Sequence, residues 1–197
     1  MMSPNFESLV VNSLTILADE PDDATAMVWN EAETQAELEG NEKAIYRLDL
    51  NDKEILLEDI EDLIAYDKIH KVKDFRLDKN EFFDEGVELL AQASAMEKLL
   101  TLSLAHNKLS DNAVRSLAAS KVIVNLQKLF LQGNQIGVEG VKALVASDSL
   151  ANLQLLYLNS NPIGPQGASA LGGPSKIMQL QELYYQNTGL GEKGLQA

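Results

Sequence analysis

The sequence contains no cysteine and only two histidines among its 197 residues. Without cysteine the chain has no disulfide framework, no thiolate zinc site and no thiol nucleophile, and this composition suits a reducing compartment. The histidines, His70 and His106, occupy unrelated positions, and no HExxH, GxSxG or P-loop spacing is present. We therefore expect a protein that is not an enzyme, with no catalytic residues, no cofactor and no metal site.

Lysine and arginine are absent from the first 42 residues, so there is no basic region of a secretory signal. The most apolar stretch, Leu9–Ala18, is interrupted by polar residues at 12, 13 and 15 and is too short to span a membrane. We expect a cytoplasmic protein that does not contact membranes. Delivery into a host cell is a second localisation that the sequence allows.

Negative charge dominates the chain. It has 30 acidic and 16 basic residues, a formal net charge of −14. Nucleic acids and anionic membranes are bound by clustered lysine and arginine, so neither is an expected partner. Ten of the acids but only one base lie in residues 1–43, which predicts a boundary between an acidic segment, 1–43, and the remainder, 44–197.

The acidic segment predicts a helical cap. The runs Phe6–Ala18 and Ala24–Leu38 have the apolar spacing of helices and are separated by an acidic, proline-containing turn. An uncovered strand at the end of a sheet would pair with other chains. We expect these two helices to cover the first strand of the sheet that the remainder of the chain predicts.

Residues 44–197 repeat one pattern at a constant spacing of 27 residues. Leu99–Asn107, Leu126–Asn134 and Leu153–Asn161 share the sequence LxxLxLxxN. Six copies start near residues 45, 72, 99, 126, 153 and 180, and the last one is incomplete at residue 197. The two-residue alternation of leucine within each copy predicts a short strand whose leucines face the core.

The second half of each copy, as in Ile136–Leu144 (IGVEGVKAL), resembles the leucine-rich repeat family in its ribonuclease-inhibitor-like class, which includes the repeats of Ran GTPase-activating proteins. The resemblance covers residues 44–197. It implies an α/β fold: a solenoid, or horseshoe arc, of six β-loop-α repeats with a parallel sheet on the concave face and helices outside.

Asparagine recurs at position 9 of four copies, counting the first residue of each copy as position 1. A buried amide at a turn can satisfy backbone groups that have no other partner. We expect a structural asparagine ladder rather than a ligand site, formed by Asn80, Asn107, Asn134 and Asn161.

Positions 3, 5 and 7 alternate with the inward leucines, so they should project from the concave face. Position 5 of the last three copies is aromatic, whereas polar and charged residues lie around it. Aromatic anchors within a polar rim are typical of protein-recognition surfaces, although aromatic ladders also stabilise sheets. The predicted partner-binding residues are Phe130, Tyr157, Tyr184, Leu155, Arg76, Lys128, Gln132 and Asn159.

These observations predict a protein–protein interaction module that binds a protein or peptide on its concave face. Two alternatives are a regulator of a small GTPase, as in Ran GTPase-activating proteins, and the substrate-recognition part of a larger enzyme. No residue matches a distinctive loop of the GTPase-activating family, so no functional residue is transferred. The chain ends inside a predicted helix. We therefore expect either a fragment of a longer protein or a homodimer through the open C-terminal end.

Overall fold

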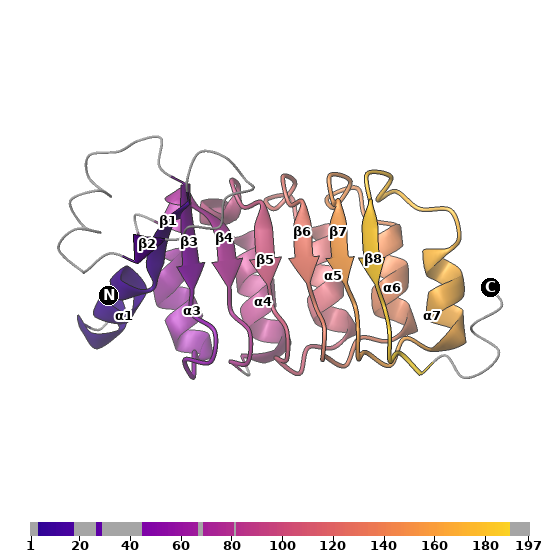
Figure 1. Ribbon diagram of the computed structural model, residues 1–197, viewed down its shortest axis with the longest axis horizontal. Coiled ribbons are helices and arrows are strands. Elements are labelled where there is room, and N and C mark those ends of the chain that lie inside the picture. Colours follow the sequence, from indigo (N-terminus) through magenta and orange to yellow (C-terminus); the bar gives the residue numbers. More distant parts are fainter. Residues whose placement is uncertain (1–3, 18–26, 29–44, 67–68, 81, 190–197) are drawn as a thin grey trace.

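A computed structural model describes residues 4–17, 27–28, 45–66, 69–80 and 82–189. Its strands form a single eight-stranded sheet in the order β2-β1-β3-β4-β5-β6-β7-β8 (Figure 1). The strands are β1 (Leu14–Leu17), β2 (Met27–Val28), β3 (Ile45–Asp49), β4 (Val72–Arg76), β5 (Thr101–Ser103), β6 (Lys128–Phe130), β7 (Leu155–Tyr157) and β8 (Glu182–Tyr184).

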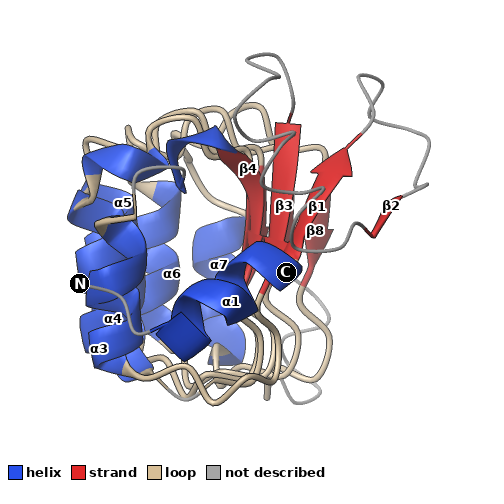
Figure 2. Cartoon of the chain, turned by 90° about the vertical axis from the view of Figure 1, so that its left-hand side faces the viewer, coloured by secondary structure: helices blue, strands red, loops and turns tan. Residues whose placement is uncertain are grey.

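Helices α3 to α7 cover one face of this sheet, and no helix of the described residues lies on the opposite face, which we call the open face (Figure 2). Strands β3 to β8 are parallel, and each connection between successive parallel strands carries an α-helix. The predicted parallel sheet with helices outside is thereby confirmed. The helical segments are α1 (Pro4–Asn12), α3 (Leu57–Ile64), α4 (Phe83–Gln92), α5 (Asp111–Ala119), α6 (Val138–Val145), α7 (Gly164–Leu171) and the 3₁₀ turns η1 (Ile69–Lys71) and η2 (Ser94–Met96).

The repeating leucines close the core between sheet and helices. Leu102, Leu104, Leu129 and Leu131 are at most 1% exposed, so their predicted inward register is correct. Helices α3, α4, α5 and α6 each add a buried leucine or isoleucine to one continuous cluster that runs through the described repeats, and the partly buried Leu171 of α7 packs against it. The last strand departs from this pattern, because Tyr185, at the position of the second inward leucine, is 37% exposed. Each repeat therefore completes its core only against its neighbours.

The predicted N-terminal helices are corrected by the structure. Helix α1 ends at Asn12, and residues 14–17 of the predicted helix 6–18 instead form β1, which pairs antiparallel with β3. The parallel sheet would otherwise end with the unpaired N–H and C=O groups of β3, and β1 supplies their partners. The β-branched Thr15 and Ile16 suit an extended backbone. Phe6, Val10 and Leu14 join the core cluster, so this segment continues the repeats' core.

The second predicted helix, 24–38, contains the short strand β2 at Met27–Val28. The rest of that prediction lies outside the described residues, as does the C-terminal end, 190–197, through which dimerisation was expected. No helix in the described part of the chain is both long and apolar enough to cross a bilayer.

Position 8 of every copy has a left-handed backbone, with φ between 55° and 69°. The residues are Asp52, Lys79, His106, Gly133, Ser160 and Asn187. Five of these six carry a side chain, although a left-handed conformation costs such residues about 1–2 kcal/mol. The turn that follows each strand therefore stores a small strain that the hydrogen bonds around it must offset.

Substitutions at two of these turns should act in opposite directions. Gly133→Ala adds a Cβ at φ +69° that also meets the His106 ring, so it should lower the free energy of unfolding by at least about 1–2 kcal/mol. Ser160→Gly should raise it by about 0.5 kcal/mol, because relief of strain exceeds the entropy that glycine gains in the unfolded chain. Urea unfolding measures the free energy of unfolding of both variants. Equal changes of the same sign in this free energy would contradict the backbone strain assigned to position 8.

Candidate functional site

The register of the parallel strands places residues of equal repeat position side by side on the open face. Position 5 forms one column through Arg76↔Ser103, Ser103↔Phe130, Phe130↔Tyr157 and Tyr157↔Tyr184. Position 3 forms a second column with the members Arg47, Asp74, Thr101, Lys128, Leu155 and Glu182. The face thus changes from charged at β3 and β4, through small residues at β5, to aromatic at β6, β7 and β8.

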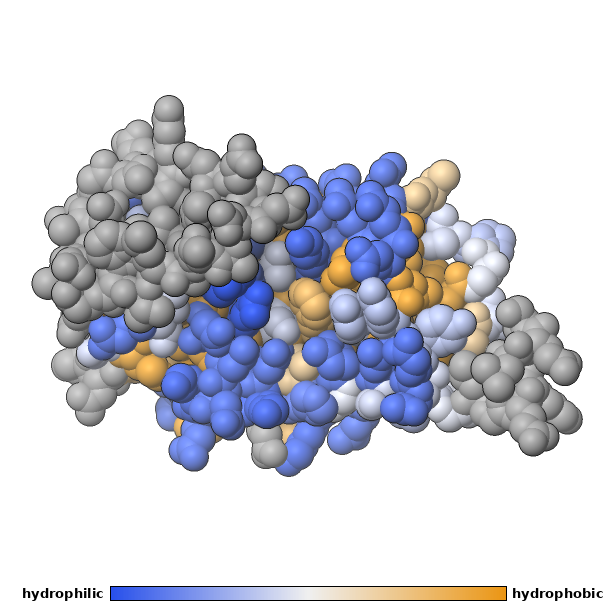
Figure 3. Space-filling view, in the orientation of Figure 1, coloured by the Kyte–Doolittle hydropathy of each residue, from blue (hydrophilic) through white to orange (hydrophobic). Residues whose placement is uncertain are grey.

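The three aromatic residues form one continuous stack. The ring centroids of Phe130 and Tyr157 are 5.0 Å apart with 24° between the planes, and those of Tyr157 and Tyr184 are 4.2 Å apart with 13°. All three rings are half-buried, so each also presents area to solvent. Figure 3 views this face and shows hydrophobic and near-neutral atoms over the C-terminal strands, between hydrophilic atoms at both strand ends. We call Phe130, Tyr157 and Tyr184 the aromatic column.

The last ring of the aromatic column keeps its hydroxyl proton. The Tyr184 hydroxyl donates a hydrogen bond of 2.9 Å to Glu182 Oε2. This bond to the Glu182 carboxylate, with a smaller contribution from Tyr157, raises the pKa of Tyr184 to about 12. The column therefore ends in a neutral phenol beside an exposed carboxylate.

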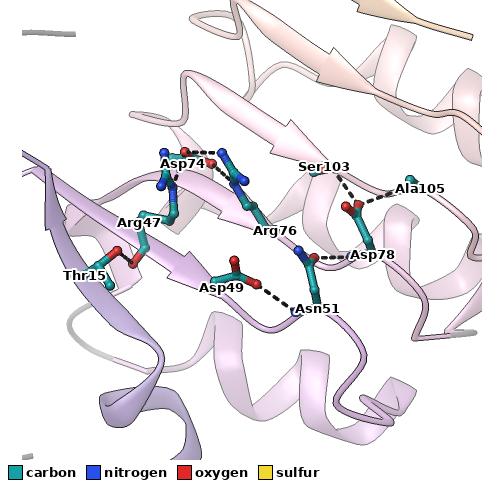
Figure 4. A network of polar contacts seen from close by, with 9 residues as sticks. All are labelled: Thr15, Arg47, Asp49, Asn51, Asp74, Arg76, Asp78, Ser103 and Ala105. Carbon is teal, nitrogen blue, oxygen red and sulfur yellow. Dashed lines mark hydrogen bonds and ion pairs between the residues drawn. The ribbon is translucent and has the colours of Figure 1, made fainter. Parts of the chain in front are cut away.

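The N-terminal part of the open face is held by an internal charge network (Figure 4). Asp74 is 6% exposed and accepts a hydrogen bond of 2.6 Å from Arg47 Nε and bonds of 3.2 and 3.3 Å from Arg76. A buried carboxylate needs such partners, because its desolvation is otherwise unfavourable. Arg76, predicted to bind a partner, is thus engaged by Asp74.

Position 7 carries a second polar ladder, which the sequence analysis did not identify. The side-chain oxygens of Asn51, Asp78 and Asn159 each accept a hydrogen bond from a backbone N–H 27 residues later, at 2.7, 2.8 and 2.9 Å. The sequence signal for this ladder is a short side chain with an acceptor oxygen that recurs at position 7. Asn159, predicted to bind a partner, also stabilises the strand end beside it through this bond. Gln132, at the same position, has a buried Oε1 with no hydrogen-bond partner among the described residues.

The asparagines at position 9 form hydrogen bonds with backbone groups of the preceding repeat. Asn134 Oδ1 accepts from the backbone N–H groups of Asn107 and Leu109 at 2.9 and 3.1 Å, and its amino group donates to Leu104 O at 3.0 Å. Asn80, Asn107 and Asn161 make the corresponding bonds to their preceding repeats. All four are at most 6% exposed, which leaves them no surface for a ligand.

A polar groove runs along the edge of the open face where the strands begin, and the sequence analysis did not predict it. Its volume is about 460 Å³. The lining residues belong to two columns spaced by 27, one directly before position 1 (Lys98, Asn125, Asn152, Gln179) and one at position 2 (Lys73, Leu100, Gln127, Gln154). Lys128, a predicted binding residue, is exposed and directly follows Gln127. We call this the lysine–amide groove.

The two histidines lie in different kinds of local structure. His70 lies in η1, whereas His106 lies in a turn, with its ring against Gly133. Among the described residues, no group of three or more acidic or histidine side chains could hold a metal ion.

The repeats match a known family. The family model of the leucine-rich repeat matches residues 95–118, 124–145 and 149–172, which contain α6, α7 and all of α5 except its last residue. No curated protein gives a significant match to the chain. The matches and the stacked strand–helix units support a leucine-rich repeat protein. Such repeats are generally protein–protein interaction modules and are typically not catalytic.

Loss of one asparagine of the position 9 ladder should be costly. Asn134→Leu leaves the N–H groups of Asn107 and Leu109 and the carbonyl of Leu104 without their partner, so we expect a loss of about 1–3 kcal/mol of unfolding free energy. The neighbouring Gln135→Leu is the control, because Gln135 is exposed. Equal unfolding midpoints in urea for both variants would contradict a structural role of Asn134.

Proposed function

We propose that this protein binds a protein or peptide partner on the open face of its sheet and carries out no catalysis itself. The aromatic column Phe130–Tyr157–Tyr184 is the anchor of this binding surface. The observation that carries the proposal is that three stacked rings stay partly in solvent on the face that no described helix covers. Large aromatic side chains with exposed area are the residues that dominate binding energy in protein interfaces.

Sheet stability alone does not account for these rings. The same repeat position holds Asp49, Arg76 and Ser103 in the preceding strands, which pair in the same parallel register. The inward leucines Leu129 and Leu156 are fully buried and close the core beneath the rings. Polar or small residues therefore suffice for this sheet, and contiguous exposed apolar area usually marks an interaction site.

The surrounding side chains fit the polar rim of such an interface. Lys128 is exposed beside Phe130, and Leu155 is half-buried between Lys128 and Glu182. Gln132 completes the surface at the carboxyl end of β6. Arg76 and Asn159 contribute less than the sequence pattern predicted, because their polar atoms already bond within the chain.

We propose further that the whole arrangement is a ribonuclease-inhibitor-like horseshoe arc of six 27-residue repeats, in which the open face is concave. The 27-residue register of β3 to β8 supports the repeat count. Strand β1 and helix α1 support a capping role for residues 1–43, in a form that differs from the predicted pair of helices. The absence of cysteine supports a cytoplasmic location.

Truncation of the central ring should weaken binding while the fold is kept. For Tyr157→Ala we expect a loss of about 2 kcal/mol, or about thirtyfold in affinity, because central anchors are best shielded from water. The partner is isolated by affinity capture with the purified chain and then titrated by calorimetry against wild type and variants. Tyr157→Phe keeps the ring stack and should bind within a few fold of wild type.

Melting curves of the same variants separate binding from folding. Glu139→Ala, on helix α6 of the opposite face, is the matched surface control and should leave affinity unchanged. If Phe130→Ala, Tyr157→Ala and Tyr184→Ala all bind the captured partner like wild type, the aromatic column is not the binding surface.

A further inference from the structure

The lysine–amide groove has two chemically different parts. Lys73 and Lys98 provide its cationic part, whereas carboxamides from the following repeats line the rest. Lys98 is exposed and Lys73 is half-buried. An amine that is partly withdrawn from water binds an anion more strongly than a fully solvated one, because the local dielectric constant is lower.

The positive charges of the groove are not neutralised within the described structure. Lys73, Lys98 and Lys128 form no ion pair there, although the chain has 30 acidic residues. The carboxylate next to Lys73 in the sequence, Asp74, is held by Arg47 and Arg76. Among the described residues, the strand starts near β4, β5 and β6 therefore carry lysines without a carboxylate partner, on a protein that is strongly acidic overall.

The carboxamides of the groove suit the main chain of a peptide. Asn125 and Asn152 donate to the carbonyls of Glu97 and Val124 at 2.8 Å, and these bonds fix the two side chains. The side chains of Gln127 and Gln154 make no hydrogen bond with the described residues. A carboxamide offers both donors and an acceptor, as does each peptide unit of an extended backbone.

The groove and the aromatic column lie along the same strands. Gln127 and Gln154 directly precede β6 and β7, and each lies three positions before an aromatic residue, which corresponds to about 10 Å of extended chain. One extended segment of a few residues can therefore contact both. A nucleic acid is the less suitable occupant, because a chain of net charge −14 repels a polyanion over its whole length.

We propose that the lysine–amide groove is the acidic-residue subsite of the binding face. It takes an extended peptide segment whose aspartate or glutamate carboxylates pair with Lys73 and Lys98, while a neighbouring apolar side chain packs on the aromatic column. This assignment rests on the proposed function, since it names the chemistry of the partner for the same face.

A peptide selection on the full-length chain tests the assignment. A phage-displayed library of random linear peptides is selected in parallel on wild type and on the Lys73→Gln/Lys98→Gln variant. We expect wild type to enrich peptides with aspartate or glutamate next to an apolar residue, and the variant to lose this preference. No enriched peptide, or enriched peptides without an acidic preference, would overturn the proposal.

Titration of the strongest synthetic peptide by fluorescence anisotropy then gives the size of the effect. Loss of two partly exposed charge pairs should weaken binding about tenfold in the Lys73→Gln/Lys98→Gln variant. The control Lys121→Gln/Lys142→Gln removes the same charge from residues outside the groove and should bind within about twofold of wild type. Equal losses in both double variants would show net charge, and not the groove, to be the cause.

Two results distinguish failure of this inference from failure of the proposed function. If the selected peptides bind wild type and the double lysine variant equally but lose affinity with Tyr157→Ala, the face binds peptides without the acidic subsite. If a single-stranded oligonucleotide binds with dependence on Lys73 and Lys98, the groove is an anion site but the peptide assignment is wrong.

Discussion

The whole structure depends on hydrogen bonds that join each repeat to its neighbour 27 residues away. Asn134 bonds back to the turn of the preceding repeat, and Asp78 bonds forward to Ala105. Loop backbone groups have no regular partner of their own, and leaving them unpaired in a buried turn is unfavourable. These side chains therefore fix the relative placement of adjacent repeats, and the left-handed residue at position 8 is the backbone conformation that this turn adopts.

The open face has two parts. In one part the polar side chains already bond within the chain, and in the other the side chains are accessible to a partner. At positions 3 and 5 of β3 and β4, Arg47 and Arg76 serve the structure, since they compensate the buried carboxylate of Asp74. At position 5 of β6, β7 and β8, the rings stack on each other, and Tyr184 donates a hydrogen bond to Glu182. A partner would have to break internal ion pairs to use the first part, whereas it only displaces water from the second.

Much of this fold was accessible from the sequence, because a fixed period determines both register and burial. The columns of Leu102 and Leu129 inside, and of Phe130 and Tyr157 outside, follow from alternation alone. Strand β1 was not accessible in this way, since its conformation is set by pairing with β3, a distant segment. The internal bonds of Arg76 and Asn159 were not accessible for a related reason. A repeat alignment shows which face a side chain occupies but not which polar group it meets there.

The contrast between global and local charge decides what the binding face can recognise. At physiological ionic strength interactions between exposed charges fade beyond about 8 Å, so carboxylates farther than this from the groove are largely screened from a ligand in it. The amines of Lys73 and Lys98 act within contact distance and are screened much less. Added salt therefore weakens two opposing effects, the attraction of the groove and the repulsion by the remaining surface. The affinity can therefore depend only weakly on salt although the groove strongly prefers carboxylates. Only substitutions that change the charge of the groove and leave the charge of the remaining surface unchanged separate the two effects.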